Sequence, residues 1–196
     1  INKNEIPYEY RLRKMNRGFE ALSYFNNRIY CMTQSPLGFE TKPRFIRIGV
    51  FNTKTRLYEA EYLYPLEGES ADKIGDMQML NAKQFLVIQQ NGEVGPQSVH
   101  LIYKVDLSKA TNVLSLKLSK APELTSERAF PRGFKYAEKS IALDLVKEGY
   151  SDFEKVEGLA VLDDSTVAVV NDNDFGVDGG RLISRPTALG IFKIKN

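Results

Sequence analysis

The sequence lacks most of the side chains that metal–thiolate proteins and nucleophilic enzymes use. Cys31 is its only cysteine, His100 is its only histidine, and it has no tryptophan. A single cysteine excludes an internal disulfide and a thiolate metal cluster. A single histidine excludes a histidine-rich zinc site and leaves at most one imidazole as a general base. An active site in this chain therefore has to use carboxylates, amides or metal-bound water.

Long apolar runs and blocks of like charge are also absent. No apolar run approaches the ~20 residues that a membrane-spanning helix needs. The 27 basic and 25 acidic residues leave a net charge of +2, so nothing electrostatic indicates nucleic-acid binding. Of the 196 residues, 42% are hydrophobic and 27% are charged, a balance typical of one soluble globular domain. The chain begins at Ile1 without a signal-peptide pattern, which predicts a processed or trimmed chain.

Most apolar segments are short and are bounded by Gly, Pro, Asn or Asp, which is typical of strands in an all-β protein. Residues 45–51 and 57–66 flank a polar tetrapeptide and predict a hairpin. Residues 99–107 alternate as a strand does, with His100 on the more polar side. Residues 140–146 also predict a strand, although a four-residue spacing around them fits a helix as well.

An internal repeat organises the chain. The run from Glu20 to Ser35 aligns without a gap with the run from Glu157 to Asp172, and a fainter copy runs from Asp76 to Asn91. Each copy contains an acid, a strand, a polar turn, a second strand and a polar exit, and an outer strand or hairpin follows it. Such sheets of about four short antiparallel strands are blades of a β-propeller.

The number of repeats predicts an incomplete ring. About three blades are present, whereas propellers close with four to eight. We therefore expect half of a six-bladed ring. Missing blades or a second chain would complete it, since open sheet edges would otherwise be adhesive.

The candidate site residues lie at the starts and exits of the inner strands. Glu20 and Glu157 each stand among apolar neighbours, where a carboxylate is costly unless it is paired or coordinated. Asn171 and Asp172 open a run of four amide or carboxylate side chains directly after a strand. Calcium takes six to eight oxygen ligands, so these four residues predict a site for Ca2+ or another divalent cation. The alternatives are that the run is an ordinary turn and that the acids bond backbone amides to fix blade packing.

Two basic residues are candidates for contact with a substrate. Arg181 follows two glycines, and Arg44 lies near the start of a strand. Each could meet an anionic group of a substrate, although such residues more often belong to a loop or a solvated face. No Gly-x-Ser-x-Gly elbow occurs, and one histidine does not support a serine-hydrolase triad.

Four blocks, taken in order, resemble the esterase-like phytase domain family. They are Asn16 to Leu22, Ile74 to Met77 with the strand that follows it, Lys155 to Ala160, and Val170 to Gly176. The resemblance implies a secreted or periplasmic β-propeller that hydrolyses phosphoesters or esters. It also implies that residues 1–196 form one partial domain without its N-terminal blades.

The chain departs from that family's pattern at two places. It has Gln89 and Gln90 where the family tends to have an acid and an arginine, and Ala21 where glycine is usual. Two functional hypotheses follow. One is a metal-dependent hydrolase of phosphate esters or related esters, in which the cation lowers the pKa of a bound water. The other is a noncatalytic, calcium-stabilised propeller that binds a protein or a glycan. A catalytic ion keeps an open coordination position, and a structural ion does not.

Overall fold

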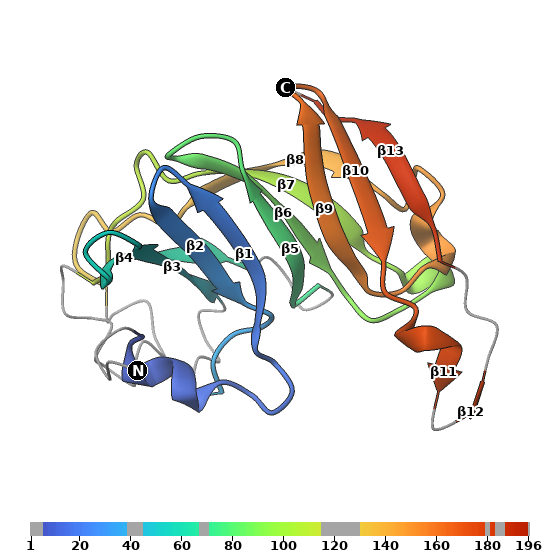
Figure 1. Cartoon of the computed structure of the whole chain (residues 1–196), viewed down its shortest axis with the longest axis horizontal. Coiled ribbons are helices and arrows are strands. Elements are labelled where there is room, and N and C mark those ends of the chain that lie inside the picture. The colour runs from blue at the N-terminus through green and yellow to red at the C-terminus, as the bar shows by residue number, and fades with distance from the viewer. Residues whose placement is uncertain are drawn as a thin grey trace.

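The computed structural model describes residues 6–38, 45–66, 71–114, 130–178, 181–182 and 187–195. Within these ranges the chain forms antiparallel sheets, joined by loops and short 3₁₀ helices. Figure 1 shows three main sheets next to one another along the long axis of the molecule. No helix in the described ranges is long and apolar enough to cross a membrane. The all-β prediction and the prediction of about three blades are confirmed.

The first sheet, sheet A, has its four strands in sequence order. Its inner hairpin turns at Asn26 and Asn27, which both have positive φ, as a tight two-residue hairpin turn requires. Its outer hairpin is the one that the sequence predicts, and the Asn52 side chain accepts backbone N–H groups within its turn. The strands are β1 (Phe19–Phe25), β2 (Arg28–Thr33), β3 (Phe45–Asn52) and β4 (Leu57–Pro65).

Sheet B repeats the same four-stranded order. Its last strand confirms the predicted strand near residues 140–146, so the helical alternative is wrong. His100 is fully buried rather than on a polar face, with the backbone of Phe153 beside it, and burial lowers the pKa of its imidazole. The strands are β5 (Lys73–Met79), β6 (Gln84–Gln90), β7 (His100–Asp106) and β8 (Glu138–Asp144).

Sheet C has three strands in the described part of the chain, in the order β13-β10-β9, where four were expected. Between β10 and β13 the chain instead forms a separate two-stranded ribbon. Within the described residues, the third blade therefore has one strand fewer than each of the other two. Its strands are β9 (Val156–Asp163), β10 (Thr166–Asn171) and β13 (Leu189–Lys193), and the ribbon consists of β11 (Val177–Asp178) and β12 (Arg181–Leu182).

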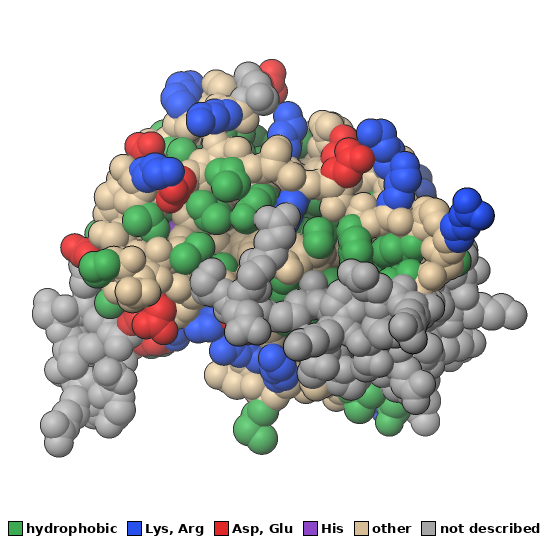
Figure 2. All heavy atoms as spheres, turned by 180° about the vertical axis from the view of Figure 1, so that it is seen from behind, with side chains coloured by type: hydrophobic (Ala, Val, Ile, Leu, Met, Phe, Trp, Pro, Cys, Tyr) green, Lys and Arg blue, Asp and Glu red, His purple; other side chains and the backbone are tan. Residues whose placement is uncertain are grey.

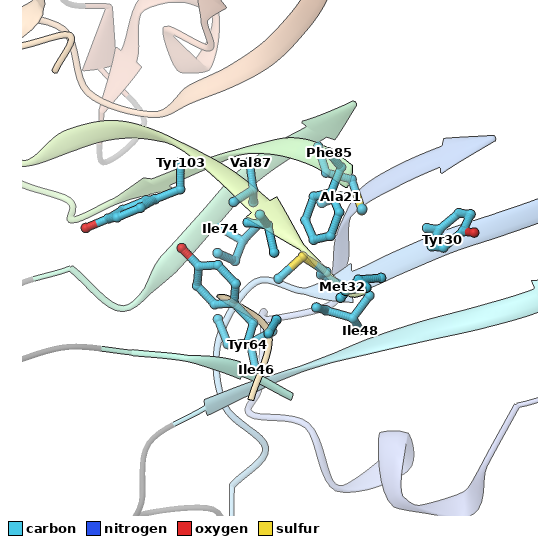
Figure 3. Packing of buried hydrophobic residues seen from close by; sticks show 14 of the residues in the cluster. Ala21, Tyr30, Met32, Ile46, Ile48, Tyr64, Ile74, Phe85, Val87 and Tyr103 are labelled. Atoms are coloured by element: carbon cyan, nitrogen blue, oxygen red, sulfur yellow. The ribbon is translucent and has the colours of Figure 1, made fainter. Parts of the chain in front are cut away.

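The sheets pack face to face, as blades do. Figure 3 shows side chains of sheet A, among them Met32 and Ile48, against Ile74, Phe85 and Val87 of sheet B. These five side chains are fully buried or nearly so, and each such burial stabilises the fold by about 1.5–3 kcal/mol. A second cluster joins the other face of sheet B to sheet C, through residues such as Ile88, Ile102, Leu159 and Val167.

The first strand of each repeat is the innermost strand of its sheet. β1 contacts β5, and β5 contacts β9, so the three inner strands lie in succession (Figure 1). The three repeats found in the sequence are thus the inner hairpins of three successive blades. The arc they form is open, which fits a partial propeller.

Charged side chains are dispersed over the back of the molecule. Figure 2 shows Lys and Arg mainly around the margin of this face, with hydrophobic side chains between them. Acidic and basic groups are interspersed there, and the described part of this face has no continuous basic stripe.

A buried ion pair secures the far end of sheet A. Arg47 of β3 donates a hydrogen bond to Glu61 of β4, and both side chains are fully buried. The Glu61 carboxylate also accepts hydrogen bonds from Tyr58 (2.8 Å) and from Tyr10 of an N-terminal 3₁₀ helix (3.1 Å). Burial and the Glu61 charge raise the pKa of both phenols, so they remain neutral donors. The network ties the N-terminal segment to the sheet.

Replacing Arg47 tests this network. We expect Arg47→Met to lower the free energy of unfolding by about 3–5 kcal/mol, because a carboxylate that has lost its cation stays buried. The double variant Arg47→Met/Glu61→Gln should regain much of this loss, because the amide still accepts from the two phenols. Urea denaturation of both variants measures the difference. Equal losses in the two variants would show that the charges are not coupled.

Candidate functional site

A bulge at the start of each inner strand positions an acid. The pairing of β1 with β2 skips Glu20, and the pairing of β9 with β10 skips Glu157. In β5 the register shifts at Gly75 and Asp76. A bulged residue does not follow the regular alternation of the strand, so its side chain points in a different direction. The three acids that head the sequence repeats therefore occupy equivalent irregular positions in three successive blades.

Glu20 and Glu157 meet in one polar cavity of about 470 Å³, which we call the channel pocket. It lies where the inner strands begin, and sheets A, B and C all contribute to it. Three basic side chains, two carboxylates and several amides line it. The lining residues are Met15, Asn16, Arg17, Glu20, Gln34, Lys73, Gln90, Asn91, Lys155 and Glu157.

The environment of Glu157 favours its protonated form. Burial is the main reason that its pKa lies above the ordinary glutamate value, and the negative charges of Asp172, Glu20 and Asp174 add to this effect. The ammonium of Lys155 opposes them. A half-buried glutamic acid beside basic groups is a typical arrangement for proton transfer to a bound substrate.

Asp76 has a different role from the other two acids. Its carboxylate accepts backbone N–H groups of Met77 at 2.7 Å and of Leu159 at 2.9 Å, the second across the boundary between sheets. Burial raises the pKa of this carboxyl, and the two N–H donors oppose the shift. Asp76 thus joins β5 to β9, which is the packing role left open as an alternative for these acids.

The polar run after β10 is held by hydrogen bonds within the run and to neighbouring segments. Asn171 is buried and its Oδ1 accepts the backbone N–H of Ala188 at 2.8 Å. Asp172 Oδ1 accepts the backbone N–H of Asp174, whose carboxylate oxygens both bond the ammonium of Lys155.

The predicted cation ligands are therefore only partly brought together. Glu20 and Glu157 line the channel pocket, and Asp172 is near enough to act on Glu157, while Asn171 bonds toward β13. In the described ranges, no group of three or more His, Cys, Asp or Glu side chains could hold a metal ion. As a set of four, these residues do not fit calcium, and the cation remains a prediction.

The two predicted substrate-binding arginines do not contribute to the described pocket. Arg44 lies outside the described residues, and Arg181 is in β12 with its side chain outside them. The structure instead places Arg17, Lys73 and Lys155 at the site. A signal for them exists in the sequence, because each stands two or three residues before the acid that heads its repeat.

Comparison with known proteins agrees with this architecture. A family model described as phytase-like, with the esterase-like activity of phytase, matches residues 2–175. No curated protein and no solved structure matches the chain. The match covers most of the sequence, including all three inner hairpins and both pocket acids, so the resemblance found in the sequence is confirmed. The chain belongs to the phytase-like family.

Proposed function

We propose that the channel pocket binds the anionic group of a phosphate ester or related ester and supports its hydrolysis. The observation that carries this proposal is the joint presence of Arg17, Lys73 and Lys155 with Glu20 and Glu157 around one cavity. The cations match an anionic group by charge, and the carboxyls supply groups for proton transfer. The esterase-like description of the family supports ester hydrolysis as the class of reaction.

The two carboxyls have separate roles in this proposal. Glu157, whose pKa is raised by burial and by the charge of Asp172, donates its proton to the oxygen of the leaving alcohol as the ester bond breaks. Glu20 accepts a proton from the attacking water. Lys73 and Arg17 offset the charge of the phosphate oxygens. These steps require only groups of this chain and one water molecule.

Replacing Glu157 and Lys73 separates proton transfer from binding. With 4-nitrophenyl phosphate we expect Glu157→Gln to lower kcat by ~10²–10⁴-fold, because the proton donor is lost. Lys73→Met should raise KM by about tenfold, or ~1.4 kcal/mol, through loss of a charge-assisted contact. With the neutral ester 4-nitrophenyl acetate, Lys73→Met should have little effect. Steady-state kinetics measure both constants.

Lys83→Met is the matched control. It removes the same charge from the turn between β5 and β6, at the opposite end of these strands, where Lys83 lies beside the ring of Tyr62. An equal change in KM for this control, or no turnover of either ester by the wild-type protein, would contradict the proposed hydrolysis.

We also propose that the same pocket can bind a divalent cation, which the steps above do not require. Glu20 and Glu157 offer carboxylate oxygens, and Asn16, Gln34 and Asn91 offer amide oxygens. When bound, such an ion would polarise a substrate oxygen and lower the pKa of a bound water. Lys155 repels a cation from this place, so the ion must compete with an ammonium group that is already present.

Calcium binding can be tested by calorimetric titration of CaCl₂ into wild-type protein and Glu157→Gln. We expect weaker binding in the variant, because a carboxylate ligand becomes a neutral amide. Calcium should also raise the melting temperature of the wild type more than that of the variant, since ligand binding stabilises only the folded state. The exposed Glu148→Gln is the control. Equal stability of wild type and variant with calcium and with chelator would exclude the ion.

The two outermost sheet faces support completion of the ring by further blades, from a second chain or from other sequence. Leu22 and Tyr24 of sheet A are 58% and 60% exposed, and Leu189 and Ile191 of sheet C are 73% and 64% exposed. They point away from sheet B, and the opposite faces of the same sheets are buried against it. Apolar sheet faces of this kind normally pack. A secreted or periplasmic location stays a prediction of the family resemblance.

We expect this chain by itself to self-associate and to be poorly soluble. Leu22→Lys combined with Ile191→Lys should reduce association, because a charged side chain on each outer face prevents sheet packing. Thr55→Lys, in the exposed outer turn of sheet A, adds the same charge elsewhere and should have no effect. Sedimentation velocity measures the result. A monodisperse, stable wild-type monomer without any partner would contradict ring completion.

A further inference from the structure

Gln90 is a buried amide at the end of β6 that bonds across the boundary between sheets. It is 1% exposed, and its Oε1 accepts the backbone N–H of Val156 at 2.8 Å. Its Nε2 donates to the carbonyl oxygen of the same residue at 3.1 Å. One side chain of sheet B thus satisfies both backbone groups of the residue directly before Glu157. The Gln90 amide thus makes the two hydrogen bonds that the backbone of a paired strand would otherwise make with Val156.

The backbone on the other side of Glu157 is held by the same sheet. Asp76 accepts the N–H of Leu159, two residues after the bulge. Gly75 makes the approach possible, because a Cβ there would lie 2.1 Å from the carbonyl oxygen of Val156. Val156 and Leu159 are therefore both attached to sheet B, and the bulged residue between them has little freedom to move.

We infer that Gln90 is a positioning residue for the channel pocket: by holding Val156 from the neighbouring sheet, it fixes where the Glu157 carboxyl lies. The hydrogen bonds of Gln90 are the structural basis of this inference. Its effect on the reaction rests on the proposed function. Phosphate or ester recognition needs the carboxyl within bonding distance of the ligand, and a displacement of about 1 Å can cost 10²-fold in rate.

The fixed position also determines which charges surround Glu157. Lys155 precedes it on the same segment, Asp172 and Asp174 lie on the turn after β10, and Glu20 approaches from β1. Arg17 and Lys73 line the same pocket. If the bulge were released, the Glu157 carboxyl would lose its fixed place among these groups.

The test is amide hydrogen exchange, measured by NMR at Val156, Glu157 and Leu159. In Gln90→Met, which keeps the side-chain volume and loses both hydrogen bonds, we expect these amides to exchange about tenfold faster, because the backbone around the bulge opens more easily. Gln90→Asn, whose amide is one methylene shorter, should act in the same direction. This second variant provides the test if the first does not fold.

Gln89→Met is the matched control. Gln89 is an equally buried amide in the same strand, and it bonds Ala71 and Tyr64 instead of β9. Its replacement should cost similar stability and leave the exchange of the Val156, Glu157 and Leu159 amides unchanged. Unchanged exchange in both Gln90 variants, or an equal acceleration in the control, would overturn the inference.

Steady-state kinetics with 4-nitrophenyl phosphate separate this inference from the proposed function. If the wild-type protein does not turn over the ester, the proposed function fails, and hydrogen exchange still decides whether Gln90 holds the bulge. If Gln90→Met exchanges faster and lowers kcat about 10²-fold with little change in KM, positioning is supported. If kcat falls while exchange is unchanged, positioning is overturned.

Discussion

The close approach of β5 to β9 is the constraint on which the site depends. At Gly75 the two strands are so near that any Cβ would overlap the carbonyl oxygen of Val156. This contact brings sheet B near enough for Gln90 and Asp76 to bond the backbone of β9 on both sides of Glu157. The packing of the blades therefore also determines the geometry of the pocket. A change that separates the blades also displaces the carboxyl.

The three acids at equivalent positions of the repeats have different roles in the structure. Each lies at a bulge, yet Asp76 is shorter and is satisfied by two backbone N–H groups. Glu20 and Glu157 are one methylene longer and reach the channel pocket. The exit positions of the same repeats diverge too. Gln34 bonds Arg17, Gln90 bonds Val156, and Asn171 bonds Ala188.

Charge balance decides what the pocket can bind. Three basic side chains, Arg17, Lys73 and Lys155, and the two carboxylates of Glu20 and Glu157 line it. Lys155 pairs with Asp174, so its charge is shared with the turn after β10. In our proposal the anionic group of the ester therefore depends mainly on Arg17 and Lys73, and bound phosphate would reduce the repulsion that a cation meets there.

The sequence by itself determined the strands, the repeat and the acids that head it, because these depend on local alternation, on turn residues such as Asn26 and Asn27, and on spacing along the chain. Only the tertiary structure decided which polar groups face one another. It buried His100, turned Asn171 toward β13, and brought Arg17 and Lys73 beside Glu157. These outcomes depend on how separate blades dock, and a bulge changes the direction of a side chain without changing the pattern of the strand that contains it.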